Sequence, residues 1–161
     1  MSERLVIGVG HEQRGDDAAG LLVARRLADA AASAAPDLRV LEHGGDGMDL
    51  LLAWEGAERV FLVDAVVSGA RPPGELHRFD AHRVPLPSAL FAGTSTHALG
   101  VAEAIELGRS LGRLPERVVV YGIEAERFDT GTGPGPEVLA AVERVAGRLL
   151  EELASREPHD A

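Results

Sequence analysis

One short stretch near the amino terminus, residues 5–20, restricts the possible fold more than any other part of the sequence. It reads LVIGVGHEQRGDDAAG. Its apolar, β-branched start is too short for a helix and is interrupted by glycines, so it predicts a buried strand at Leu5–Val9. The Ala/Leu-rich segment from Ala18 to about Ala32 predicts a helix. A buried strand that passes through a polar loop into a helix is typical of α/β folds.

The rest of the chain continues this alternation of strands and helices. Further apolar strands are predicted at 38–41, 59–63 and 117–122, a more polar edge strand at 75–79, helices at about 47–54, 96–112 and from 136, and irregular segments at 80–96 and 124–135. The pattern predicts an α/β fold, a three-layer sandwich with a twisted, mostly parallel five-stranded sheet and helices on both faces. The edge strand can run antiparallel. We expect one domain over residues 1–161, with a frayed tail from about residue 155.

Composition excludes several classes of function. The chain has 16 basic and 26 acidic residues and a net charge of -10, which argues against nucleic-acid and anionic-membrane partners. No run approaches the roughly 18 apolar residues of a membrane span, and Leu5–Val9 is too short for the apolar core of a signal peptide. Cysteine is absent, which removes disulfides, thiolate metal sites and cysteine nucleophiles. We therefore expect a cytoplasmic protein whose chemistry uses oxygen and nitrogen ligands.

The polar loop after the first strand carries two adjacent acids, Asp16 and Asp17. One carboxylate is enough to cap the following helix, so the second is surplus. The glycine spacing is GxGxxxxG, which differs from the dinucleotide pattern, and the Lys and Ser/Thr of a phosphate-binding Walker loop are missing after Gly15. Two acids at a helix start would also repel a phosphate. The loop therefore favours a cation, although Asp17 taken by itself fits a cap or a solvated first-turn acid better than a ligand.

Three side chains from separate segments are predicted to meet at one crevice. In open α/β sheets, ligands bind beyond the carboxyl ends of the strands, where the strand order reverses. For the common order 2-1-3, Asp17 after the first strand and Asp64 at the end of the third share that crevice. His97 lies at the predicted start of a helix and adds an imidazole. Two carboxylates and one imidazole suit a divalent cation with open positions for water or substrate.

Five blocks of the sequence resemble, in order and spacing, the hydrogenase maturation proteases. The blocks are GVGHEQRGDDAAG, HGGDGMDLL, VFLVDAVVSGARPPG, THALG and RVVVYGIE, and the resemblance extends from Leu5 to about Leu150. These endopeptidases remove the C-terminal extension of the [NiFe] hydrogenase large subunit. The resemblance implies that the substrate and partner is the large-subunit precursor after nickel insertion. It also implies that Asp17, Asp64 and His97 are the catalytic and metal-binding residues, and that the nickel is carried by the precursor.

Two positions depart from this family's pattern. Family members usually carry asparagine after GVG and aspartate before the GG pair, whereas this chain has His11 and His43. His43 ends the second predicted strand near the crevice and could add a nitrogen donor. Asp16 is a candidate general base, although capping the first helix suits it better.

Other functions fit parts of the sequence. Two carboxylates in one crevice could share a proton as an aspartic dyad, but His97 beside them favours a metal. A serine hydrolase is disfavoured because no GxSxG motif is present. A non-catalytic chaperone of the nickel-loaded precursor remains open. A flavodoxin-like small-anion-binding module fits the fold but conflicts with the acids at its expected site.

Overall fold

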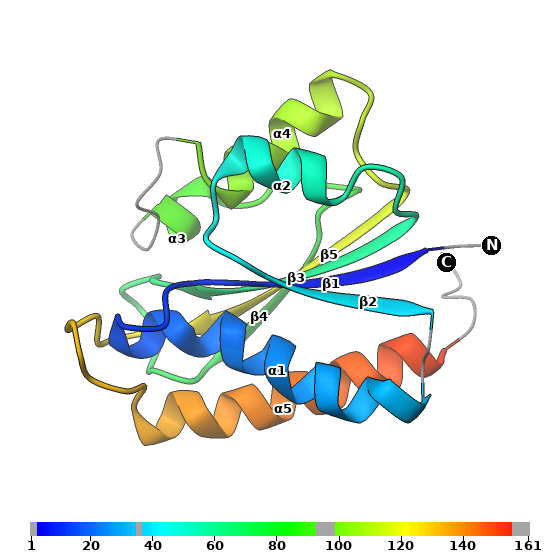
Figure 1. The fold of residues 1–161 in the computed structure, drawn as a ribbon. Coiled ribbons are helices and arrows are strands. Elements are labelled where there is room, and N and C mark those ends of the chain that lie inside the picture. The colour runs from blue at the N-terminus through cyan, green and yellow to red at the C-terminus, as the bar shows by residue number, and fades with distance from the viewer. Residues whose placement is uncertain (1–2, 35–36, 93–98, 156–161) are drawn as a thin grey trace.

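A five-stranded sheet runs through the middle of the protein, between two layers of helices (Figure 1). Its order is β2-β1-β3-β5-β4, in which β4 pairs with β5 in the antiparallel sense and the other neighbours are parallel. The strands are β1 (Arg4–Val9), β2 (Leu38–His43), β3 (Arg59–Val66), β4 (Leu76–Asp80) and β5 (Arg117–Glu124). This computed structural model describes residues 3–34, 37–92 and 99–155. The predicted 2-1-3 order and the antiparallel edge strand are confirmed.

The helices divide between the two faces of the sheet as Figure 1 shows. One layer holds α1 (Ala19–Ala34) and α5 (Pro136–Ala154); the other holds α2 (Gly47–Ala53), α3 (Ser88–Ala92) and α4 (Val101–Ser110). Each layer packs on its own apolar cluster, because the central strands are apolar on both faces. The predicted three-layer sandwich is therefore confirmed. Within the described ranges, no helix combines the length and apolarity needed to cross a membrane.

Several segments differ from the sequence predictions. β3 extends to Val66, so Asp64 lies inside the strand and not at its end, because the pairing with β5 continues past Asp64 to Val66 and Glu124. The segment 80–96, predicted to be irregular, contains the short helix α3. The helix predicted from about residue 96 is seen as α4 from Val101, and His97 lies outside the described residues.

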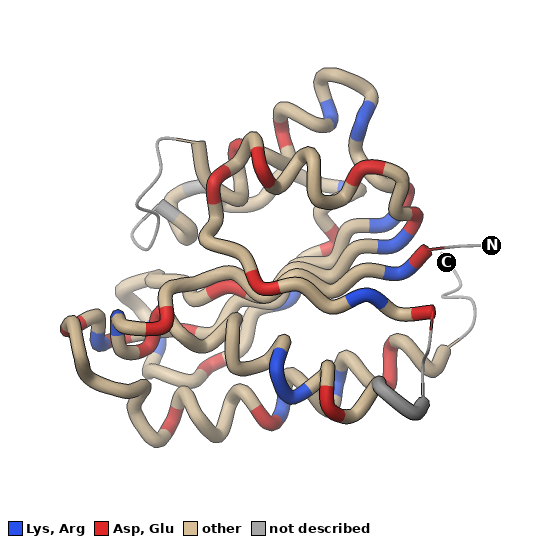
Figure 2. Tube along the Cα trace, viewed as in Figure 1, with Lys and Arg blue, Asp and Glu red and all other residues tan. Residues whose placement is uncertain are grey.

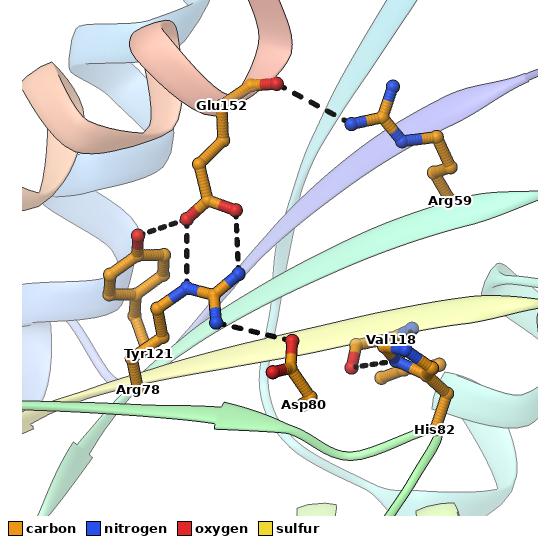
Figure 3. A network of polar contacts seen from close by, with 7 residues as sticks. All are labelled: Arg59, Arg78, Asp80, His82, Val118, Tyr121 and Glu152. Carbon is orange, nitrogen blue, oxygen red and sulfur yellow. Dashed lines mark hydrogen bonds and ion pairs between the residues drawn. The ribbon is translucent and has the colours of Figure 1, made fainter. Parts of the chain in front are cut away.

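The carboxyl end of α5 is fastened to the edge of the sheet where the parallel strands begin (Figure 3). Arg78 of β4 donates to both carboxylate oxygens of Glu152, at 3.0 and 2.8 Å, and the Tyr121 hydroxyl of β5 donates to the same carboxylate. Arg4 donates to the backbone oxygen of Leu153 at 2.7 Å, and Arg59 donates to that of Glu152 at 3.5 Å. Arginines are well suited to the last carbonyls of a helix, where they also meet its negative dipole end.

Glycines bring the start of α1 into backbone contact with the strands. A Cβ atom at Gly20 would overlap the carbonyl oxygens of Val9 and Val63, and one at Gly8 would overlap the carbonyl oxygen of Gly20. No side chain larger than hydrogen fits between these backbones. The close approach fixes where α1 begins, and with it the 3₁₀ helix η1 (Gly15–Ala18) that precedes it.

We expect Gly20→Ala to lower the free energy of unfolding by roughly 1–3 kcal/mol, the usual effect of overpacking a close contact. The measurement is urea unfolding followed by circular dichroism. Gly147→Ala is the matched control, because Gly147 lies on α5 with nothing within 4 Å of an added Cβ atom. That change should be neutral or stabilising by up to ~1 kcal/mol, since alanine is the better helix former. Equal stability of the two variants would contradict the close contact.

Candidate functional site

The two ends of the sheet hold different charged residues. Arg4, Arg59 and Arg117 lie in register where β1, β3 and β5 begin, and in Figure 2 the blue segments of these strands lie near the two termini. The buried acids lie at the opposite, carboxyl end of the strands. Among the described residues, the charged side chains in the buried class are those of Asp16, Asp17, Asp64 and Glu124. Because ionised groups are rarely buried without a partner, this end of the sheet is the candidate functional site.

Asp17 is held in η1 by its backbone. Its N–H donates to the Arg14 carbonyl at 3.0 Å, and its carbonyl accepts from the His11 N–H at 3.1 Å. Burial raises the pKa of the Asp17 carboxyl from 3.8 to about 6, while the nearby Arg14 charge opposes the rise. The Oδ2 atom of Asp17 is buried and has no hydrogen-bond partner among the described residues. An unpaired, buried carboxylate oxygen is unfavourable unless something binds it.

Asp64 lies close enough to Asp17 for the two charges to interact. Burial raises the pKa of the Asp64 carboxyl well above its usual value, and the negative charge of Asp17 raises it further, while the Ala65 N–H bound to Oδ1 at 2.9 Å opposes both effects. Asp64 shares the sheet face of Leu62 and Val66, which pack in the cluster that includes α2 and α4. Two neighbouring buried carboxylates are suited either to a divalent cation or to a shared proton.

The prediction that Asp16 caps the first helix is wrong. Its Oδ2 accepts from the N–H groups of Glu126 and Arg127, both at 2.8 Å, and its Oδ1 accepts from the Gly135 N–H at 2.8 Å. η1 has no side-chain cap. Asp16 therefore fastens the loop 125–135, which follows β5, to the loop that carries Asp17. Its oxygens already bind three backbone donors, which does not suit the candidate role of general base.

The three histidines of the prediction have different outcomes. His43 ends β2 beside Val9, and its Nδ1 accepts from the Gly45 N–H at 2.9 Å. The backbone of His11 contacts both Asp17 and Arg14, and its side chain is half-buried. His97 lies outside the described residues. Within the ranges that are described, no three His, Asp or Glu side chains form a group able to hold a metal ion.

Sequence reasoning missed two charged residues at this end of the sheet. Arg14 Nη1 lies 3.6 Å from Asp17 Oδ2. Glu124, predicted to start a loop, ends β5 and is buried, where it accepts from the Ser68 N–H at 2.7 Å and contacts His77 Nε2 at 2.8 Å. The spacing of three residues between Arg14 and Asp17 across a tight turn was a usable signal, because it allows an ion pair. No local signal identified the partners of Glu124, which lie 56 and 47 positions away.

Replacing Asp16 should loosen a distant loop. We expect Asp16→Ala to increase amide hydrogen exchange at 126, 127 and 135 by about tenfold or more, because three backbone donors lose their acceptor. The free energy of unfolding should fall by more than the ~1 kcal/mol typical of a lost helix cap. Asp46→Ala is the control, since Asp46 is a genuine cap of α2 and accepts from the Met48 and Asp49 N–H groups. If the two variants lose equal free energy of unfolding, and amide exchange at 126, 127 and 135 is unchanged in Asp16→Ala, the fastening role of Asp16 would be contradicted.

Burial of Asp17 gives a prediction for stability against pH. The folded-state pKa of about 6 exceeds the ordinary 3.8, so the protonated carboxyl favours folding at low pH and this contribution is lost as the pH rises through about 6. Asp17→Asn stays neutral, so at pH 7.5 it should unfold with a free energy roughly 1–3 kcal/mol higher than the wild type. Below about pH 4 the difference should disappear.

Urea unfolding at several pH values measures this difference. Asp29→Asn, which removes an exposed carboxylate of α1, is the control and should differ little from the wild type in its free energy of unfolding. An Asp17→Asn variant that is less stable than the wild type at pH 7.5 would show that the charge of Asp17 is well compensated.

Comparison with known proteins agrees with this architecture. A family described as hydrogenase maturation protease matches residues 21–152. The hydrogenase 2 maturation protease of Escherichia coli K12 is 30% identical over 151 residues, which cover 92% of this chain and 89% of that protein. HupD of Rhodobacter capsulatus, a hydrogenase expression/formation protein, is 29% identical over 92% of this chain and 70% of its own.

Solved structures agree as well. The hydrogenase maturating endopeptidase HybD of E. coli superposes with a TM-score of 0.77 at 28% identity, over 94% of this chain and 92% of that one. The [NiFe] hydrogenase maturation protease HybD of Thermococcus kodakarensis gives a TM-score of 0.67 at 28% identity, over 95% and 99%. The match to the family covers most of the chain, and the curated relative is matched over nearly its whole length. This chain therefore belongs to the hydrogenase maturation protease family.

Proposed function

We propose that this protein is the endopeptidase that removes the C-terminal extension of a [NiFe] hydrogenase large-subunit precursor in the cytoplasm, after nickel insertion. The precursor is the substrate, and it carries the nickel with it. Asp17, Asp64 and His97 bind that ion during the reaction. Family membership supports the reaction, and the carboxyl end of the sheet supports the site.

The observation that carries the proposal is the buried Oδ2 of Asp17, which has no hydrogen-bond partner among the described residues and lies near Asp64. Two adjacent carboxylates disfavour an anion, which argues against the anion-binding module. Their raised pKa values mean that the fold holds two acids where ionisation is unfavourable without a cation. A divalent ion would supply that missing charge, and carboxylate oxygens are suitable ligands for it.

His97 is proposed as the third ligand because of where its described neighbours lie. The Leu99 carbonyl accepts from the Gly47 N–H at 2.8 Å, at the start of α2, and the Leu90 carbonyl accepts from the Val67 N–H at 3.1 Å, just after β3. Both anchors lie beyond the carboxyl ends of strands. His97 precedes Leu99 by two residues, a span of at most about 7 Å. An imidazole from this segment would complete a site with open positions for the scissile peptide.

In this mechanism, the two carboxylates and the imidazole hold the precursor's nickel against the peptide bond to be cut. When bound there, the ion would polarise the scissile carbonyl and activate a water molecule. The buried surroundings strengthen these electrostatic effects because water is excluded. Asp16 keeps the loop carrying Asp17 in place through the bonds described above, and takes no part in proton transfer.

Processing of purified precursor tests the proposal. Wild-type protein should shorten the nickel-loaded precursor and leave the nickel-free precursor intact, as followed by mass spectrometry. Asp17→Ala, Asp64→Asn and His97→Ala should each lower the cleavage rate by about 100-fold or more, because Lewis-acid stabilisation contributes several kcal/mol. Asp29→Asn is the control and should cleave at the wild-type rate.

Other outcomes identify the alternatives. Equal cleavage of nickel-free precursor, or a His97→Ala enzyme that keeps activity with an altered pH profile, would indicate an aspartic dyad. A stable complex without cleavage would indicate a chaperone, a role that the endopeptidase relatives do not favour. If the protein does not interact with the precursor, the small-anion-binding module would be the remaining alternative.

A further inference from the structure

Arg14 places a positive charge close to both the Asp17 carboxylate and the Phe128 ring. It belongs to the loop between β1 and η1, and its backbone forms a bridge with Thr130 of the opposite loop. Its guanidinium lies over the Phe128 ring, 5.8 Å from the ring centroid, with Nη1 3.6 Å from Asp17 Oδ2. The Arg14 side chain is 31% exposed, whereas that of Asp17 is 2% exposed. The guanidinium therefore lies between solvent and the buried carboxylate.

The contact between these two groups is electrostatic without a hydrogen bond. Arg14 Nη1 and Asp17 Oδ2 are both buried, and neither has a hydrogen-bond partner among the described residues. Elsewhere in the protein arginine binds carboxylates closely, as in the Arg78–Glu152 pair at 2.8 Å. A pair built for stability would form such bonds, because unpaired buried donors and acceptors are unfavourable. The long contact leaves the Oδ2 atom available to another ligand.

We propose that Arg14 is a removable counter-cation, which neutralises the charge of Asp17 until the precursor's nickel arrives. While it remains in place, it keeps free divalent ions from binding tightly to Asp17. This inference rests on the proposed function. Arg14 is a specificity-determining residue in this sense, because it reserves the site for an ion that the substrate delivers. It does not bind the scissile peptide.

Physical considerations support an exchange of one cation for another. A metal ion must approach Oδ2 to about 2.0–2.3 Å, and a guanidinium held 3.6 Å from the same atom would repel it. Arginine remains charged, so it cannot lower this repulsion by losing a proton. It must move away. Because the Arg14 side chain is partly exposed, it can move toward solvent, and precursor binding can supply the free energy for that displacement.

Metal binding by the purified protein at pH 8 tests the proposal. Calorimetric titration with Zn²⁺ and with Ni²⁺ should give dissociation constants about tenfold or more lower for Arg14→Met than for the wild type, because a like charge is removed from the site. Methionine keeps an unbranched, flexible stem without the charge and can pack on Phe128. Arg14→Gln, which retains a polar side chain, should change in the same direction. Thermal melting establishes that both variants are folded.

Arg26→Met is the matched control. It removes one positive charge from the same region of sequence, but Arg26 is exposed on α1 and pairs with Glu143 at 2.6 Å. Its dissociation constants should stay within about twofold of the wild type, because salt screens distant surface charges. Adding Asp17→Ala to Arg14→Met should abolish the gain in affinity.

Several results would overturn the counter-cation role. They are unchanged or weaker metal binding by Arg14→Met, no detectable binding by that variant, and a gain that survives the loss of Asp17. Processing assays separate this outcome from failure of the proposed function. If the protein cleaves the nickel-loaded precursor but Arg14→Met has the metal affinity of the wild type, only the proposed role of Arg14 is contradicted. Tighter metal binding by Arg14→Met without any precursor cleavage supports Arg14 and removes the proposed substrate.

Discussion

Two buried carboxylates that lie close enough for their charges to interact are the constraint on which the rest of this structure depends. Ionised Asp17 and Asp64 repel each other, and burial deprives both of water. The surrounding backbone must therefore hold them in place against their own electrostatics. Pairing of β3 with β5 beyond Asp64 fixes one, and the backbone contact of Gly20 with β1 and β3 fixes the other. Functional sites often hold such unfavourable groups, and the remaining fold supplies the stability.

The two neighbouring acids of the loop after β1 have different roles. Asp16 points its carboxylate at the loop 125–135 and binds three of its N–H groups. This places Phe128, next to Arg127, under the guanidinium of Arg14. Asp17 Oδ2 has no hydrogen-bond partner among the described residues and lies 3.6 Å from Arg14 Nη1. A continuous set of contacts thus links Asp16 to Arg14, the residue beside the buried charge of Asp17.

The distribution of charge over the whole protein also affects which ions approach this site. Arginines fasten the end of the sheet where α5 finishes, while the buried acids collect at the other end. In a protein of net charge -10, the acids at this end of the sheet attract small cations, including ions that are not part of the reaction. Selection of the substrate's ion over free ions then requires a residue near Asp17 that disfavours free ions. Arg14 meets this need in a simple way, because a tethered cation competes with free ions but yields to one delivered with a bound substrate.

The sequence alone determined the architecture and part of the site. Alternating apolar strands and helices specify a parallel sheet with helices on both faces, because each periodicity follows from local geometry. Asp17 and Asp64 were also predictable as neighbours, since the 2-1-3 order brings the ends of β1 and β3 together. The placement of His97 remains a prediction. Only the tertiary structure decided that Asp16 binds a loop 110 to 119 positions away, that Glu124 is buried against His77, and that Arg14 rests on Phe128. Those partners come from distant segments, and the physical reason they escape sequence reading is that local propensity carries no information about which loops meet after the sheet has formed.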